Sequence, residues 1–333
     1  MGRGLVRAAL YLPGYTDGRC RIGGADEDAF TFAATALERA LRPEPDDVRE
    51  LVLRSLGTAA SLDPEAVAPF VGRRPTPAPG SASLSEALRL AQAARHPELI
   101  VAVAAAREAG SLSARDPPGE GAVALLVDDR PDAEALPELP PAAGLGALGE
   151  IARAHGAPGV WVGDWKADPA GGRVLPSEAA ASSSPGYTVS QGAFVPAPRY
   201  DEGRPSRWGF VAQRCASCST LTFPARGRCR RCGAESGLRG ERLPLNGATV
   251  VASTWIGPGG QPTEFDPQVE MSGPYGVVLA ELVPGVRATL QVADARPADV
   301  RVGSRVDTVL RRLYAIEGAW RYGRKAVPAS GTP

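Results

Sequence analysis

Apolar residues recur with two different spacings in the first half of the chain. Short apolar runs bounded by turn-forming residues predict strands at residues 4–12, 50–56, 99–105, 122–128 and 160–162. The third and fourth of these runs are apolar throughout, which is typical of a sheet covered on both faces. Spacings of three and four residues predict helices that begin near Asp28, Asp63, Ser81 and Leu145. This alternation predicts an α/β domain over residues 1–175.

The pattern changes after residue 175. Residues 176–206 are irregular and rich in Ser, Pro and Gly, so we predict a linker that buries little surface. Five β segments occupy the last third of the chain, at residues 248–255, 276–282, 286–292, 305–314 and 319–327. Strands of this number and length, separated by Gly-rich and Pro-rich turns, predict a small five-stranded β-barrel of the OB-fold type over residues 244–328.

The cysteines cluster between the linker and the predicted barrel, in residues 207–243. Two Cys-x-x-Cys pairs, Cys215 with Cys218 and Cys229 with Cys232, have ten residues between them. Pairs on two short turns can place four thiolates at the corners of a tetrahedron, which is the geometry of structural zinc. A redox Cys-x-x-Cys would occur once and would open a helix. The spacing therefore predicts a zinc ribbon whose metal, with four sulfur ligands, has no open position for catalysis.

The composition of the chain argues against some classes of function. Hydrophobic residues make up 44% of the 333 residues and charged residues 22%, as in globular proteins. Lys plus Arg and Asp plus Glu both total 37, and this balance argues against bulk affinity for nucleic acid or an anionic membrane. No apolar run approaches the length of a membrane span. Cys20 is the one cysteine outside the ribbon, so we expect a reducing, cytoplasmic compartment.

Few residues outside the ribbon are candidate nucleophiles. Ser81 precedes a predicted helix, where the helix N-terminus could assist it, but activation also needs a base. The two histidines of the chain are poorly placed for that role. His96 lies at the far end of the same helix, and His155 lies at the C-terminus of another. Cys20 is flanked by two arginines, which favour a reactive thiolate, but it lies in a predicted loop. Ser81 and Cys20 are weak catalytic candidates.

Arginines give the predicted ribbon a basic surface, at Arg226, Arg228, Arg230 and Arg231. These side chains could contact the phosphates of a coenzyme such as CoA, acidic groups of a partner protein, or solvent alone. They could also contact nucleic acid, because zinc ribbons and OB barrels both occur in nucleic-acid binders. Aromatic residues make up only 6% of the chain, which leaves few side chains to stack on bases.

The order of motifs from residue 208 to residue 327 resembles a known family. The two Cys-x-x-Cys pairs are followed by the segments 247–250, 274–278 and 302–306 as in the zinc-ribbon plus OB-fold proteins that accompany thiolases and hydroxymethylglutaryl-CoA synthases. Ser219 stands where the first knuckle of that family usually has Gly. This position often needs a positive φ, so we expect some backbone strain there.

The first domain also resembles a family, through residues 11–13, 25–31 and 119–126. These segments look like the start of a hydroxymethylglutaryl-CoA synthase or thiolase-like domain. In such enzymes the cysteine that takes up the acyl group opens the helix that here begins near Ser81. The second α/β half, which brings the histidine and completes the oxyanion site, has no counterpart before the linker. The resemblance implies a shortened, inactive thiolase-like half domain with a face that a partner covers.

Together the two resemblances imply a non-catalytic or scaffolding subunit of an acyl-CoA complex. The ribbon and barrel would dock on an active thiolase, synthase or aldolase and help to form its acyl-CoA channel, with the ribbon arginines near the CoA phosphates. The reaction would be Claisen or retro-aldol chemistry at an acyl thioester, with the catalytic groups supplied by the partner. Two alternatives remain open: a self-sufficient acyltransferase that uses Ser81 or Cys20, and a nucleic-acid-binding module.

Overall fold

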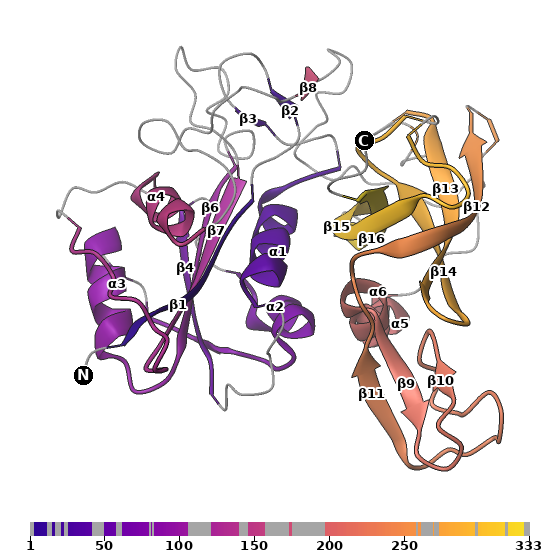
Figure 1. Cartoon of the computed structure of the whole chain (residues 1–333), viewed down its shortest axis with the longest axis horizontal. Coiled ribbons are helices and arrows are strands. Elements are labelled where there is room, and N and C mark those ends of the chain that lie inside the picture. The colour runs from indigo at the N-terminus through magenta and orange to yellow at the C-terminus, as the bar shows by residue number, and fades with distance from the viewer. Residues whose placement is uncertain are drawn as a thin grey trace. The chain divides into compact units, whose positions relative to one another are not determined.

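A computed structural model of the chain divides into two compact units, Met1–Ser183 and Ser184–Pro333 (Figure 1). The residues that the structure describes are 3–11, 15–16, 21–22, 26–41, 50–57, 62–79, 81, 83–105, 121–139, 146–156, 173–174, 197–257, 259–260, 269, 273–296, 299–316 and 319–329. The predicted strand at residues 160–162 lies outside these ranges. Each unit has its own sheets and its own core, and each is described by itself.

The first unit is built on a five-stranded mixed sheet with the order β1-β7-β6-β4-β5. Its strands are β1 (Gly4–Tyr11), β4 (Val52–Gly57), β5 (Thr76–Pro77), β6 (Glu98–Ala104) and β7 (Gly121–Asp128). Strand β4 is parallel to β5 and β6, whereas β7 is antiparallel to both β1 and β6. A small second sheet has the order β3-β2-β8, formed by β2 (Tyr15–Thr16), β3 (Arg21–Ile22) and β8 (Arg173–Val174).

Helices cover both faces of the mixed sheet, with α1 and α2 on one face and α3 and α4 on the other (Figure 1). They are α1 (Ala29–Ala40), α2 (Pro64–Val71), α3 (Leu84–Ala93) and α4 (Gly146–Ala154). Every residue of β6 and β7 is buried, which confirms the prediction from their continuous apolar runs. No helix in the described part of the chain has the length and apolar character needed to cross a membrane.

Local capping explains where the helices begin. Asp28 accepts a hydrogen bond from the Thr31 N-H at 2.9 Å, and the Thr31 hydroxyl accepts one from the Asp28 N-H at 2.8 Å, so the two residues form a capping box. Helix α3 begins later than predicted. Its cap is Ser83, which accepts from the Glu86 N-H at 3.2 Å, so Ser81 lies ahead of the helix and does not cap it.

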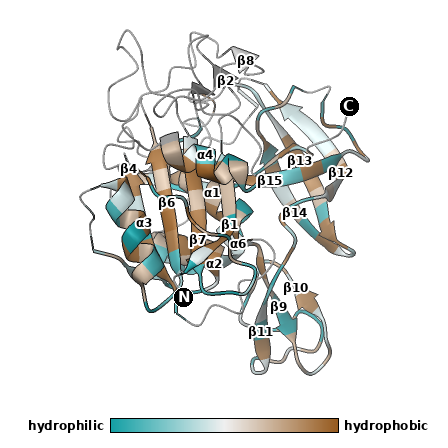
Figure 2. Cartoon of the chain, turned by 60° about the vertical axis from the view of Figure 1, so that its left-hand side comes forward, coloured by the Kyte–Doolittle hydropathy of each residue, from teal (hydrophilic) through white to brown (hydrophobic). Residues whose placement is uncertain are grey.

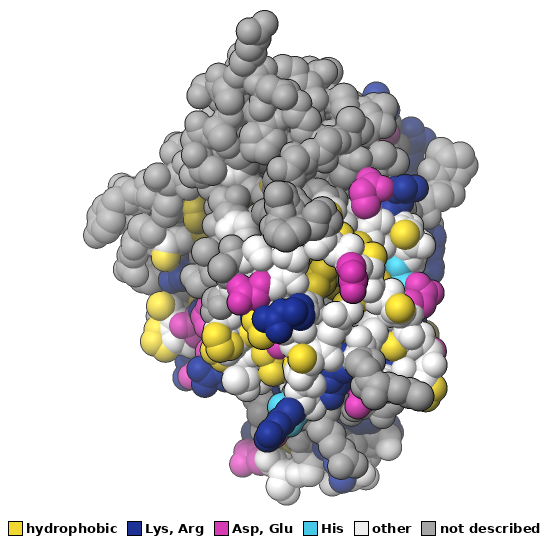
Figure 3. Space-filling view, turned by 90° about the vertical axis from the view of Figure 1, so that its left-hand side faces the viewer, with side chains coloured by type: hydrophobic (Ala, Val, Ile, Leu, Met, Phe, Trp, Pro, Cys, Tyr) yellow, Lys and Arg dark blue, Asp and Glu magenta, His cyan; other side chains and the backbone are white. Residues whose placement is uncertain are grey.

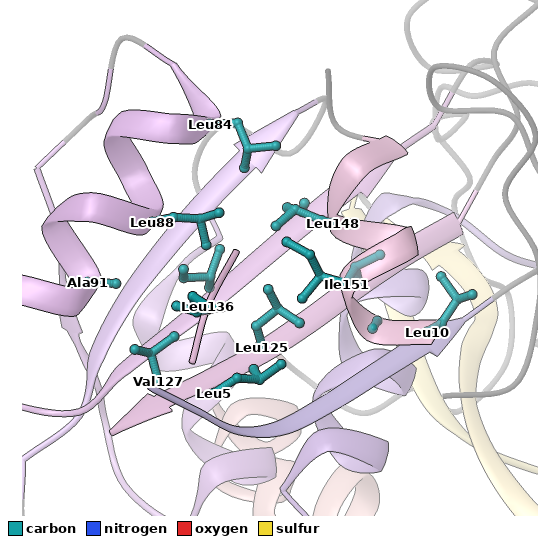
Figure 4. Close-up of a cluster of buried hydrophobic side chains, with 14 of the residues drawn as sticks. Leu5, Leu10, Leu84, Leu88, Ala91, Leu125, Val127, Leu136, Leu148 and Ile151 are labelled. Carbon is teal, nitrogen blue, oxygen red and sulfur yellow. The ribbon is translucent and has the colours of Figure 1, made fainter. Parts of the chain in front are cut away.

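One hydrophobic core fills the space between the sheet and the helices α3 and α4 (Figure 4). Figure 2 shows hydrophobic positions following the strands of this sheet. Leu84, Leu88 and Ala91 of α3 all lie in this core, at the spacing of three and four residues that puts them on one face of the helix. Leu148 of α4 and Leu125 of β7 are both fully buried in it. The face of the molecule that carries α3 presents hydrophobic, acidic and basic side chains interspersed among one another (Figure 3).

The second unit contains the ribbon and the barrel. The ribbon is a three-stranded antiparallel sheet of order β10-β9-β11, with β9 (Val211–Cys215), β10 (Leu221–Thr222) and β11 (Leu238–Arg242). The barrel is closed, with the order β12-β13-β14-β16-β15. Its strands are β12 (Ala248–Ile256), β13 (Tyr275–Val283), β14 (Val286–Val292), β15 (Arg305–Ile316) and β16 (Ala319–Pro328). The five predicted strands are therefore confirmed.

Two short helices, α5 (Ala197–Glu202) and α6 (Arg204–Gly209), precede the ribbon. The predicted irregular linker, which would bury little up to residue 206, is wrong for residues 197–206. Tyr200 and Trp208 are both buried. The Tyr200 hydroxyl donates to the Tyr322 carbonyl at 2.9 Å, and the Trp208 indole N-H donates to the same carbonyl at 3.1 Å. These bonds attach the two helices to β16.

Candidate metal centre

The two Cys-x-x-Cys pairs lie on turns of the same design. In the first turn the Ser219 N-H donates to the Cys215 carbonyl at 2.8 Å, and in the second the Gly233 N-H donates to the Cys229 carbonyl at 3.1 Å. Ser219 has φ 59° and Gly233 has φ 75°, so both turns need a left-handed residue at the same position. The expected positive φ at Ser219 is confirmed. In the first turn this left-handed position is occupied by a serine, which adopts a positive φ less readily than glycine does.

The four cysteine sulfurs converge between these turns. All four lie within 4.8 Å of one another, with 3.6 Å between Cys215 and Cys232 and 3.5 Å between Cys218 and Cys229. Four sulfurs that each lie about 2.3 Å from a central zinc ion would be roughly 3.8 Å apart. The sulfurs are too far apart for disulfides. The spacing and the donor atoms therefore fit a tetrahedral zinc ion held by the four thiolates.

Hydrogen-bond donors around the sulfurs favour their charged form. Hydrogen bonds with the side chain and backbone of Thr220 lower the pKa of Cys218 to about 6. Backbone N-H groups of Cys232 and Arg231 lower the pKa of Cys229, and the Arg231 N-H lies 3.4 Å from its sulfur. Since the thiolate is the form that binds zinc, these donors prepare the site for a metal.

The pKa of Cys232 shifts in the opposite direction, upward. The Ala234 backbone N-H lowers its pKa, but the neighbouring thiols of Cys218 and Cys229 outweigh this and raise the pKa of Cys232 to about 11. Four sulfurs at this distance cannot all carry a negative charge without repelling one another. A bound dication would offset that repulsion, so the cluster is suited to a metal and unsuited to four free thiolates.

The predicted basic surface lies on the ribbon, where Arg226, Arg228, Arg230 and Arg231 are all exposed. Gln213, which the sequence analysis did not single out, organises part of it. The buried Gln213 amide accepts from the N-H groups of Arg226 and Gly227 at 3.2 and 2.9 Å, and it donates to the Arg228 carbonyl at 3.1 Å. This loop therefore has a defined conformation from which the arginines extend. Contact with CoA phosphates remains a prediction.

Ser81 has no base beside it in the described part of the chain. The Ser81 hydroxyl oxygen is buried, and the described residues provide no hydrogen-bond partner for it. His96 contacts Glu50 and His155 contacts Glu134, each through Nδ1 at 2.9 Å. The structure thus does not bring either histidine to Ser81. Cys20 lies outside the described residues.

The barrel buries basic residues that the sequence analysis missed, namely Arg311, Arg312, Arg321, Arg324 and Lys325. Basic residues in a strand normally predict a solvent-facing position, so no local signal reveals their burial. Arg311 donates to an Asp294 carboxylate oxygen at 3.0 Å. Arg324 is buried beneath α6 and donates to the Trp208 carbonyl, and its burial lowers its pKa to about 9. These contacts appear only when the barrel closes.

Comparison with solved structures gives partial matches. A "Ltp2-ChsH2(DUF35) aldolase" structure matches 42% of this chain and 100% of its own, with 24% sequence identity and a TM-score of 0.31. A structure of MvaS in complex with 3-hydroxy-3-methylglutaryl coenzyme A matches 39% of this chain and 41% of its own, with 23% identity and a TM-score of 0.29. The likeness of residues 1–175 to a thiolase-like half domain stays a prediction.

Sequence comparison carries the family assignment. Residues 209–237, which include all four cysteines, match the family model described as "ChsH2, rubredoxin-like zinc ribbon domain". A DUF35 domain-containing scaffold protein of Methanocaldococcus jannaschii is 32% identical over 124 residues, which are 37% of this chain and 83% of that protein. A protein of the same description from Methanothermobacter thermautotrophicus is 29% identical over 126 residues, 37% of this chain and 90% of its own. The chain therefore belongs to the family of DUF35 domain-containing scaffold proteins.

Proposed function

We propose that this chain is a non-catalytic scaffold subunit that docks on a thiolase-family partner. The observation that carries the proposal is the 32% identity to a relative described as a scaffold protein, over 83% of that relative. The chemistry of the described residues supports it. A zinc ion held by four thiolates has no open coordination position, and none of the described residues places a base beside Ser81.

The proposed domain organisation keeps the sequence boundaries except at the linker, with a thiolase-like half domain at 1–175, a linker at 176–196 that ends where α5 begins, a zinc ribbon at 207–243 and an OB-fold at 244–328. The strand order of the barrel supports the last assignment. In chain order its strands are arranged first, second, third, fifth and fourth, and closure comes from β14 beside β16 and β12 beside β15. A five-stranded barrel with crossed connections is what an OB-fold requires.

The partner in this proposal is an active thiolase or hydroxymethylglutaryl-CoA synthase-like enzyme that acts on an acyl thioester. It supplies the nucleophile, the base and the oxyanion donors, while this chain helps to shape the acyl-CoA channel. The exposed arginines at positions 226, 228, 230 and 231 contact the CoA phosphates in the assembled complex. Arginine is suited to this role because its planar guanidinium can bind two phosphate oxygens at once.

The test is purification of the tagged, full-length chain from its source organism, followed by identification of the co-purifying protein. A thiolase-family enzyme should co-purify, and acyl-CoA turnover should require it. The chain alone should show no turnover. Turnover by the chain alone that is lost in Ser81→Ala but kept in Ser85→Ala would overturn the proposal, because it would place a working nucleophile in this chain.

The CoA contact has a separate test on the purified complex. We expect Arg228→Gln and Arg230→Gln each to weaken CoA binding by roughly fivefold, the effect of one exposed charge pair of about 1 kcal/mol. Arg301→Gln, an exposed arginine outside the ribbon, is the matched control. Dephospho-CoA should reveal which arginine faces the 3′-phosphate, because its binding should not change when that arginine is replaced. Equal affinities in all three variants would exclude the ribbon from the CoA site.

A further inference from the structure

The second unit contains a cavity of about 740 Å³ to which neither the zinc site nor the proposed partner assigns a role. It lies where α6, the ribbon and the barrel meet, and its wall combines residues from all three parts. Its volume falls within the range of small-molecule pockets, about 300–1,000 Å³. Because the wall is made largely of strands and helices that hydrogen bond to one another, the cavity is preformed.

Much of the cavity wall is apolar. The partly exposed Phe223 lines it and packs edge to face against the buried Phe210, with 5.5 Å between the ring centres. Leu290 of β14 and Leu313 of β15 line it from the barrel, and Leu290 is buried in the barrel core. Such a surface favours the hydrocarbon part of a ligand and not a fully hydrated ion.

The remaining wall is positively charged. Among the residues that the structure describes, three arginines line the cavity, Arg207, Arg287 and Arg324, against one carboxylate, Glu202. The Glu202 carboxylate accepts a hydrogen bond at 2.7 Å from Arg199, which does not line the cavity. Arg207 and Arg287 are exposed, and Arg287 also contacts the Glu281 carboxylate, with 3.4 Å between Nε and Oε1. The wall therefore attracts a negative charge at the same place where it favours hydrocarbon.

Arg324 adds a buried guanidinium to the cavity wall. Its guanidinium donates to the carbonyls of Trp208 and Thr308, which are neutral acceptors. Burial makes the charged form of this side chain costly, and this is why its pKa falls to about 9.

We infer that this cavity binds a small amphipathic carboxylate, whose hydrocarbon chain lies against Phe223 and Leu313 and whose carboxylate is held by the exposed Arg207 and Arg287. A neutral hydrocarbon would leave the arginines unused. Inorganic phosphate would leave the apolar wall unused. The inference does not depend on the proposed thiolase-family partner, because every residue that it uses belongs to the second unit of this chain.

The experiment is isothermal titration of the full-length, zinc-loaded protein with octanoate, octanamide and inorganic phosphate. Octanoate should bind saturably with one site per chain. Octanamide has the same hydrocarbon tail as octanoate but no charge. It should bind at least about fivefold more weakly, since a charge-assisted hydrogen bond is roughly twice as strong as a neutral one. Phosphate should neither bind saturably nor compete. Absence of saturation with octanoate, equal affinity for octanamide, or competition by phosphate would each overturn the inference.

Variants locate the binding in this cavity. Arg207→Gln and Arg287→Gln should each weaken octanoate binding roughly fivefold. Thr289→Trp, at an exposed position in the cavity wall, should abolish binding because the indole would occupy the space. Arg301→Gln, which removes an exposed arginine that does not line the cavity, should bind as the parent protein does. Equal weakening by Arg301→Gln, or unchanged binding in Thr289→Trp, would refute the cavity as the site. Zinc content and thermal unfolding verify that each variant is folded.

Discussion

A buried ion pair between neighbouring strands of the first unit offers a sharp test of how its sheet is stabilised. Arg54 of β4 contacts Glu98 of β6 through two parallel hydrogen bonds, Nε to Oε2 and Nη2 to Oε1, both at 2.9 Å. Each side chain is only 5% exposed. Arg54 also donates through Nη1 to the Pro79 carbonyl at 2.9 Å, so the same guanidinium holds the segment that leads to Ser81.

Removing one partner should cost much more than removing both. Glu98→Gln leaves a buried guanidinium without its counter-charge, and we expect a loss of about 3 kcal/mol in the free energy of unfolding. Arg54→Met leaves a buried carboxylate and should cost about 3 to 5 kcal/mol. The double variant Arg54→Met with Glu98→Leu removes both charges and keeps the volume. It should lie within about 2 kcal/mol of the parent protein, because no buried charge is then left without a partner.

Hydrogen exchange of β4 and β6 peptides over a series of urea concentrations measures this stability within the first unit, and the barrel peptides serve as an internal reference. Arg153→Met is the matched control. Arg153 contacts Glu150 at 2.9 Å, but the two side chains are 51% and 47% exposed, so its loss should cost under about 0.5 kcal/mol. The reasoning is refuted if Glu98→Gln costs less than about 1 kcal/mol, or if the double variant loses as much as the two single variants combined.

Three further predictions follow from the described contacts. Ser219→Gly should stabilise the zinc-bound protein by about 0.5 kcal/mol in thermal unfolding, because it relieves a φ of 59°, while Ser219→Ala should not. Leu148→Ala should cost about 3 kcal/mol in urea unfolding, since the fully buried side chain would leave a cavity in the core; no loss would contradict the packing. Cys229→Ser should lower the zinc content and remove exchange protection from β9–β11, and an unchanged zinc content would contradict four-sulfur ligation.

Much of the fold could be predicted because its signals are local. The capping pair at Asp28 and Thr31, the Asp63-Pro64 helix start and the apolar runs of β6 and β7 each depend on a few neighbouring residues. The cysteine knuckles are equally local, since each turn is closed by bonds within four or five residues. For the same reason the positive φ at Ser219 could be expected from its place in the turn. The mixture of parallel and antiparallel strands in the sheet could not be predicted. Whether β7 pairs parallel or antiparallel with β1 and β6 depends on residues that are distant in sequence.

Sequence alone thus determined most of the helices and strands of the described residues, the four-cysteine cluster and the separate character of the two halves, because backbone propensity, capping and thiolate spacing act over short distances. Tertiary structure decided which polar groups are buried. Tyr200 and Trp208 anchor α5 and α6 only because β16 presents the Tyr322 carbonyl to them, 114 or more residues further along the chain. Arg54 and Arg324 are buried, and the arginine-lined cavity exists, only because segments far apart in sequence pack together, so no stretch of neighbouring residues carries that information.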